Sequence, residues 1–257
     1  MKLELETVGI IHTPYKEKFA VPRQPGLVSA AKAQLILSPP FDEADALRGL
    51  EQFSHVWLIF AFHETMGKGW SPTVRPPRLG GNERLGVFAT RSTFRPNPLG
   101  LSVAKLDSIT IKNNQCILNL SGIDLVDGTP ILDIKPYVPY ADSLPDAQAG
   151  YATDAPIADM PVTFTDEALN QIAAQRKKHP ELQTFIAQVL AQDPRPAYKK
   201  NKTTRQEYGV KLYDFNVRWT VEDNITTVFS VIKTDTITTL ATVTTPTKET
   251  EPESTND

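Results

Sequence analysis

The first 140 residues of the chain contain a series of short segments typical of β-strands and very little helical pattern. The segments are rich in β-branched and other apolar residues and are separated by Gly, Pro, Asn or Asp. Short strands that do not alternate with long helices argue against a doubly wound parallel sheet and favour a barrel or a sandwich. The predicted strands lie at residues 6–11, 33–37, 55–62, 85–90, 101–112 and 116–120.

Two connections in this half can be predicted from residue types. Asn113 and Asn114 separate the last two segments, and because asparagine tolerates positive φ angles, the pair predicts a hairpin turn. Between the second and third segments, the apolar residues Leu47, Leu50 and Phe53 recur on one helical face. We therefore predict a short helix there, with Asp42 as its N-cap.

The pattern changes after a connection rich in Pro, Ala and Asp. Thr165 is a suitable N-cap for a helix over about residues 166–178, and a second amphipathic helix is predicted over about residues 181–192. Two strands joined by a tight turn follow, at residues 210–221 and 225–232. These elements predict a small α+β unit.

The chain is therefore expected to have a mainly β, barrel-like N-terminal domain at residues 1–142 and a small α+β C-terminal domain at residues 162–233. Residues 143–161 form the linker between them. Residues 234–257 are rich in threonine and end in acidic residues, which predicts a disordered tail.

Composition limits the class of protein. Hydrophobic residues make up 40% of the chain and charged residues 22%, as in ordinary soluble proteins. The longest apolar run, Val56 to Phe62, is far shorter than the roughly 18 residues that a membrane-spanning helix needs. The N-terminus lacks the apolar region of a secretion signal. We expect a cytoplasmic protein with no membrane segment.

Cysteine and histidine usage argues against a metal cofactor. Cys116 is the single cysteine, which excludes an intrachain disulfide and a zinc site with several thiolates. The four histidines show no spacing typical of zinc ligands. No metal is expected.

Charge is distributed unevenly. The net charge is −3, but residues 65–106 contain seven basic residues and one acidic residue, and residues 195–218 contain seven basic and two acidic residues. Local basic segments of this kind can contact nucleic-acid phosphates even in an acidic protein. A non-enzymatic RNA-binding module, which needs only these two segments, is therefore the main alternative to an enzyme.

Three segments beside strands carry polar residues, two of them together with Gly and Pro, and backbone groups there can be held facing a ligand. They lie at residues 19–26, 61–65 and 86–102. In the last loop, Arg91 and Arg95 lie four residues apart, and Pro96 and Pro98 stiffen the loop, an arrangement that suits a carboxylate or a phosphate. From residue types alone, the first segment is more often a plain connection between strands, and a purely structural role explains the other two equally well.

A fourth segment, residues 124–137, places acidic residues on either side of an Asp-Gly-Thr-Pro turn. Asp127 could face a ligand, or it could cap its own turn. Spacing does not separate these alternatives.

These segments resemble the TsaA-like family, whose characterised bacterial members methylate N6 of threonylcarbamoyladenosine beside the anticodon of tRNA. The resemblance covers about residues 5–233 and does not include the threonine-rich tail. The motifs that carry it are Pro22–Gly26, Arg91–Gly100, Asp127–Pro130 with Asp133–Tyr137, and Asp193–Tyr198.

The resemblance implies a homodimeric, barrel-like methyltransferase domain that binds S-adenosylmethionine without a Rossmann fold. The absence of a Gly-x-Gly motif between a strand and a helix agrees with this expectation. The cofactor residues implied by the resemblance are Gln24, Pro25, Gly26, His63, Glu64, Arg91, Leu101, Asp127, Gly128, Thr129 and Pro130.

The implied reaction is an in-line transfer of the sulfonium methyl group to N6, for which positioning supplies most of the rate. The acceptor nitrogen carries a proton, and Asp127 and Glu64 are the predicted proton acceptors. The partner would be tRNA, in particular threonine-accepting tRNAs. The residues predicted to contact it are Arg95, Lys135, Tyr137, Arg195, Tyr198, Lys199 and Lys200.

Overall fold

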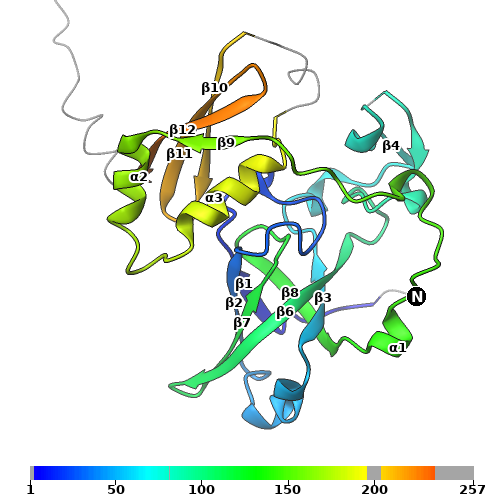
Figure 1. Ribbon diagram of the computed structural model, residues 1–257. Coiled ribbons are helices and arrows are strands. Elements are labelled where there is room, and N and C mark those ends of the chain that lie inside the picture. The colour runs from blue at the N-terminus through cyan, green and yellow to red at the C-terminus, as the bar shows by residue number, and fades with distance from the viewer. Residues whose placement is uncertain (1–2, 81, 196–203, 235–257) are drawn as a thin grey trace, which may run out of the picture.

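The computed structural model of the protein describes residues 3–80, 82–195 and 204–234. Within these residues, the N-terminal part forms a closed antiparallel barrel with the strand order β1-β2-β7-β6-β3-β8 (Figure 1). The expectation of a mainly β, barrel-like fold is confirmed. The barrel strands are β1 (Gly9–His12), β2 (Lys32–Leu37), β3 (His55–Ala61), β6 (Leu99–Lys112), β7 (Gln115–Ser121) and β8 (Thr129–Pro136).

Alternation of side chains along the strands produces the barrel core. In β3, the side chains of Val56, Leu58 and Phe60 are buried, and they meet Leu118 of β7 and Ile131 of β8 in one apolar cluster. Each fully buried side chain of this size stabilises the fold by roughly 1.5–3 kcal/mol relative to exposure. The residues between them in β3 are half-buried and face outward, as a period of two requires.

The hairpin that joins β6 to β7 turns at the predicted asparagine pair. Asn113 and Asn114 have φ angles of 51° and 60°, which a hairpin turn of this type demands. This prediction is confirmed.

Strand β8 was not predicted from the sequence, because proline and charged residues interrupt its apolar pattern. The strand nevertheless closes the barrel by pairing with β1 on one side and β3 on the other. Lys135 and Asp133, two of the charged residues that interrupt the apolar pattern, form an ion pair of 2.8 Å with each other.

Two local predictions in this half were wrong. The predicted helix behind Asp42 is a pair of 3-10 turns, η2 (Ala44–Leu47) and η3 (Leu50–Gln52), because Gly49 between them adopts a left-handed φ of 90°. The predicted strand at residues 85–90 is only β5 (Leu85–Gly86), followed by the 3-10 turn η6 (Val87–Ala89). β5 pairs with β4 (Thr73–Val74).

The connection at residues 143–161 follows the short helix α1 (Pro139–Asp142) and includes the 3-10 turn η7 (Gly150–Ala152). The C-terminal part then forms a four-stranded sheet with the order β10-β11-β12-β9, in which β9 is parallel to β12. Its elements are β9 (Val162–Phe164), α2 (Asp166–Ala173), α3 (Leu182–Ala191), β10 (Gln206–Leu212), β11 (Phe215–Glu222) and β12 (Ile225–Lys233).

Both predicted helices exist, although they are shorter than expected. Thr165 caps α2 as predicted, since its side chain accepts a hydrogen bond from the Ala168 amide at 3.3 Å. The single strand predicted at residues 210–221 is two strands, because Tyr213 has a φ of 53° and turns the chain between β10 and β11.

The segment between β1 and β2 packs into the C-terminal core. Tyr15, Ala30 and Ala31 are buried in one cluster with Phe185 of α3 and Trp219 of β11. Helix α3 lies between the C-terminal sheet and the barrel (Figure 1), and the Gln188 side chain accepts a hydrogen bond of 3.0 Å from the Ala30 amide. The loop that connects two barrel strands is therefore fixed by the C-terminal part.

The tail predicted at residues 234–257 lies outside the described residues except for Thr234. No helix in the described part of the chain is long and apolar enough to span a bilayer.

Candidate functional site

A cavity of about 580 Å³ lies at the end of the barrel where β3 ends and where β6 and β8 begin. Its volume is in the range of small-ligand sites. The lining combines an apolar side, which includes Phe60, Leu125 and Val126, with basic and acidic side chains from the surrounding loops. The cavity therefore suits a ligand that has both an apolar and a charged part.

The two loops with basic residues are joined at this cavity. The Arg91 guanidinium donates a hydrogen bond to the Gln24 side-chain oxygen. The backbone amide of Gly26 donates to the Gly122 carbonyl at 2.8 Å, and both glycines have positive φ angles. These contacts hold the Pro22–Gly26 motif against the end of β7 and beside Arg91.

Arg95 organises its own loop. Its guanidinium donates to the carbonyls of Thr90 and Val87 at 2.7 and 3.2 Å and lies over the ring of Phe88. Arg95 lines the cavity, and one of its guanidinium nitrogens is engaged by these loop carbonyls. Arg91 is the more exposed of the two arginines.

An ion pair lies at the edge of the cavity. The Lys18 ammonium is 2.8 Å from a carboxylate oxygen of Glu64. Burial, assisted by the charge of Lys68, lowers the pKa of Lys18. Burial and the nearby Lys18 charge also lower the pKa of His63, so its imidazole is neutral at neutral pH. His63 is therefore an uncharged group next to Glu64, whose carboxylate is paired with Lys18.

A second carboxylate, Asp124, lines the cavity. The Ser102 hydroxyl donates a hydrogen bond of 2.5 Å to Asp124 Oδ1. Burial raises the pKa of Asp124 to about 6, although the Ser102 hydrogen bond and the Arg91 charge lower it in part. Asp124 is not one of the proton acceptors predicted from the sequence, because nothing in the sequence shows which side chain of this acidic segment faces the cavity.

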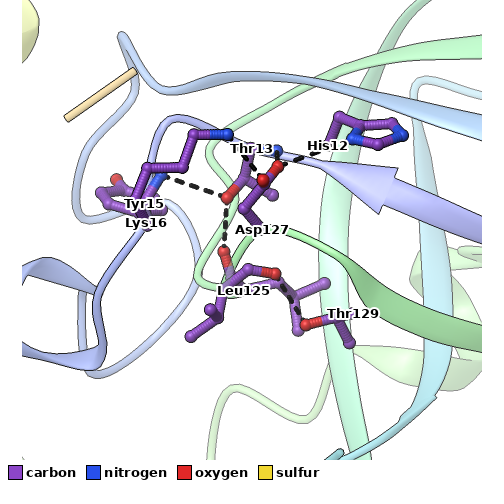
Figure 2. Close-up of polar contacts among 8 residues, drawn as sticks. His12, Thr13, Tyr15, Lys16, Leu125, Asp127 and Thr129 are labelled. Atoms are coloured by element: carbon purple, nitrogen blue, oxygen red, sulfur yellow. Dashed lines mark hydrogen bonds and ion pairs between the residues drawn. The ribbon is translucent and has the colours of Figure 1, made fainter. Parts of the chain in front are cut away.

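Asp127, a predicted proton acceptor, is not among the residues that line the cavity. Figure 2 shows its carboxylate directed toward the end of β1 and the residues after it. Oδ1 accepts a hydrogen bond from the Thr13 amide at 2.8 Å, Oδ2 is 2.6 Å from the Lys16 ammonium, and His12 Nδ1 is 3.7 Å away. In this structure Asp127 ties its turn to the neighbouring chain segment.

The predicted cofactor residues fall into two groups. Those that line the cavity are Gln24, His63, Glu64, Arg91, Leu101 and Thr129. Those that are sequence neighbours of lining residues without lining the cavity themselves are Pro25, Gly26, Asp127, Gly128 and, in β8, Pro130. Lining residues that sequence reasoning did not single out include Lys18, Trp57, Phe60 and Asp124.

Of the residues predicted to contact tRNA that the structure describes, Arg95 lines the cavity and the others have the following surroundings. Lys135 pairs with Asp133 on β8, and Tyr137 packs against Trp57 with a ring-centroid distance of 5.7 Å. Arg195 is only 3% exposed and forms two hydrogen bonds, of 2.7 and 3.1 Å, with the Asp193 carboxylate. Tyr198, Lys199 and Lys200 lie outside the described residues.

Among the described residues, no three His, Cys, Asp or Glu side chains are grouped as metal ligands would be. The candidate site is thus built from arginine, amide, hydroxyl and carboxylate groups around an apolar wall.

Family models, two curated relatives and a solved structure that match this chain all belong to one group of methyltransferases. The family models described as tRNA-methyltransferase O N-terminal domain and TrmO C-terminal domain match residues 10–143 and 157–234. A tRNA (adenine(37)-N6)-methyltransferase from Escherichia coli is 59% identical over 220 residues, which cover 86% of this chain and 94% of the relative.

A Pseudomonas aeruginosa protein named as a putative S-adenosylmethionine-dependent methyltransferase is 51% identical over 221 residues, which cover 85% of this chain and 93% of that protein. A crystal structure of TrmO from Pseudomonas aeruginosa superposes with a TM-score of 0.74 at 42% identity. It covers 90% of this chain and 99% of the crystallised chain.

Proposed function

The chain belongs to the tRNA-methyltransferase O family, and we propose that it methylates N6 of threonylcarbamoyladenosine at position 37 of tRNA. It is an S-adenosylmethionine-dependent tRNA adenine-N6 methyltransferase by its 59% identity to the Escherichia coli enzyme over most of both chains. The observation in this structure that carries the proposal is the cavity at the barrel end, where arginine, amide and carboxylate groups meet an apolar wall.

The residues present fit S-adenosylmethionine. Arg91 and Gln24 would hold the carboxylate of its methionine part, and the apolar side chains of Phe60, Leu125 and Val126 would cover its adenine. The cofactor would supply a methyl group that is already activated by a positively charged sulfur. The chain's own residues would orient this group toward the acceptor nitrogen and exclude water.

The surroundings of the cavity favour a polyanionic substrate. Lys18, Arg23, Arg91 and Arg95 line it, and the segment at residues 65–106 adds further basic side chains. Basic groups of this kind would bind tRNA phosphates and place the base at the cavity. Threonine-accepting tRNAs are the proposed partners, in the cytoplasm.

We also propose that the protein acts as a homodimer. Leu101 lines the cavity and is 57% exposed on the outer face of β6, opposite Ile59 of β3 in the sheet register. An apolar outer face beside a ligand cavity is suited to a second protomer, which would bury it and add a wall to the site.

The dimer can be tested by sedimentation. Leu101→Asp should convert a dimer into a monomer and reduce methylation. Ile111→Asp is a matched control, since Ile111 is also 57% exposed on β6 but lies near the hairpin turn, far along the strand from the cavity. A monomeric wild-type protein with full activity would rule out this part of the proposal.

The proposed function is tested with purified protein, S-adenosylmethionine and tRNA that either carries or lacks the threonylcarbamoyl group. Mass spectrometry of the nucleosides should show one added methyl group on threonylcarbamoyladenosine only. Cells without the gene should lack the methylated nucleoside. An RNA-binding module without activity would instead bind tRNA equally well with or without cofactor, and Arg91→Ala would leave that binding unchanged.

A further inference from the structure

Of the described residues that line the cavity, Glu64 and Asp124 are the acidic ones. The Glu64 carboxylate is paired with the Lys18 ammonium at 2.8 Å and its side chain is about one-third exposed, at 35%. The Asp127 carboxylate is directed at Thr13 and Lys16 instead. A proton acceptor within the cavity should be neither neutralised by a close cation nor turned away from it. Asp124 lines the cavity, and among the described residues it forms no ion pair within 4.0 Å, although the Arg91 charge is near enough to lower its pKa.

The position of Asp124 is fixed by a buried partner. Ser102 is 1% exposed, and it lies on the face of β6 that points into the barrel, in line with the buried Ala104 and Leu106. Its hydroxyl donates a hydrogen bond to Oδ1 of Asp124, and the Asp124 backbone amide also donates to the carboxylate. These contacts fix the orientation of a carboxylate that lines the cavity.

We propose that Asp124, oriented by Ser102, is the general base that removes the N6 proton during methyl transfer. This inference rests on the proposed function, because it assigns a role within that reaction. Ser102 is a positioning residue, since it acts only through Asp124.

The chemistry explains why a base is needed. In threonylcarbamoyladenosine, N6 lies between the purine ring and a carbonyl group, so its lone pair is delocalised and it is a poor nucleophile. As the bond from N6 to the methyl carbon forms, the bond from that carbon to the sulfonium sulfur breaks and leaves a neutral thioether. The N6 proton passes to Asp124, which becomes a neutral carboxylic acid and later releases the proton to water.

The electrostatic environment agrees with this role. Burial raises the pKa of Asp124 to about 6, so the group is ionised at neutral pH but is a stronger base than an exposed aspartate. His63 is the rival acceptor, because its imidazole lines the same cavity and its lowered pKa keeps it neutral.

The test is single-turnover methyl transfer to threonylcarbamoylated tRNA between pH 5 and pH 9, with saturating cofactor. The wild-type rate should rise to a plateau with an apparent pKa near 6. Asp124→Asn should lower the plateau by about 10²-fold or more and abolish this inflection, while the Kd for S-adenosylmethionine changes by less than about tenfold. Asp124→Glu should recover part of the rate.

Three further variants sharpen the result. Ser102→Ala should move the inflection to higher pH, since the hydrogen bond that favours the ionised carboxylate is lost. His63→Gln should keep the inflection, whatever its effect on cofactor affinity. Asp166→Asn removes the same charge from an exposed position on α2 and should leave rate and inflection unchanged.

Two outcomes would overturn the inference: an Asp124→Asn protein that is folded by circular dichroism and keeps the wild-type rate and inflection, or an inflection that disappears in His63→Gln. Failure of the proposed function looks different, because the wild-type protein itself would then transfer no methyl group to tRNA, and that result would overturn both.

Discussion

The hydroxyl of Ser102 on β6 and the carboxylate of Asp124, which follows β7, are joined by a hydrogen bond of 2.5 Å at the open end of the barrel. The two residues are 22 positions apart in the sequence, and their contact places an ionisable group beside the apolar wall of the cavity. Because desolvation disfavours its ionised form, a carboxylate in this position weakens the fold when it is charged.

Asp124→Asn should stabilise the protein, and the gain should depend on pH. The folded-state pKa, about 6, lies above the ordinary value of 3.8, so the contribution of this group to stability is complete below pH 3.8 and is lost as the pH rises through 6. Asparagine avoids that loss. Urea unfolding should show a gain of roughly 2–3 kcal/mol at pH 8 and almost none at pH 3.5. Equal gains at both values would contradict this account.

Gly100→Ala should damage the cavity wall. A Cβ atom at Gly100 would overlap with the ring of Phe60, which packs against Phe62 with a ring-centroid distance of 5.2 Å. We expect a loss of stability of about 1–3 kcal/mol and at least tenfold weaker binding of S-adenosylmethionine, measured by thermal unfolding and calorimetry. Gly86→Ala is the control, since nothing lies within 4 Å of its Cβ position and its φ is −56°.

Arg91→Ala should weaken cofactor binding more than it weakens the fold. Arg91 is exposed and hydrogen-bonded to Gln24, so its loss removes a charged donor from the cavity and frees the Pro22–Gly26 loop on one side. Calorimetry should show an increase in Kd of about 10- to 100-fold, the usual range for a hydrogen bond to a charged group. Arg84→Ala changes the charge of the same basic segment outside the cavity and should leave the Kd unaltered.

Asp127→Ala and Asp127→Asn should separate a structural role from a catalytic one. Alanine leaves the Thr13 amide without its acceptor and should cost about 1–3 kcal/mol of stability. Asparagine keeps an acceptor oxygen for that amide and removes only the negative charge that pairs with Lys16. If Asp127 holds the turn, the Asn variant keeps most of its methyl-transfer rate. A rate as low as that of Asp124→Asn would instead assign the proton acceptor to Asp127.

Local sequence rules predicted the elements whose structure depends on neighbouring residues. The turn at Asn113-Asn114, the cap at Thr165 and most barrel strands follow from backbone preference and alternation. Strand β8 could not be found this way, because its charged residues are satisfied by each other and its partners are distant in sequence.

The candidate site shows the same limit. The motifs at Pro22–Gly26 and Arg91–Gly100 pointed to the right region, and the structure brings Gln24 and Arg91 into contact. The choice between Asp124 and Asp127 depends on which way two side chains three residues apart are turned. That direction is set by Ser102 and Thr13, which lie far away in the chain.

The segment that carries the Pro22–Gly26 loop connects two barrel strands and also packs in the core of the C-terminal part. It leaves the barrel after β1, buries Tyr15, Ala30 and Ala31 against α3 and the C-terminal sheet, and returns to the barrel at β2. We expect residues 1–142 expressed alone to expose this apolar surface and to lose the shape of one cavity wall. In the full chain, the two family domains should unfold in a single cooperative transition, and a substitution in the core around α3 should alter cofactor affinity without touching the cavity.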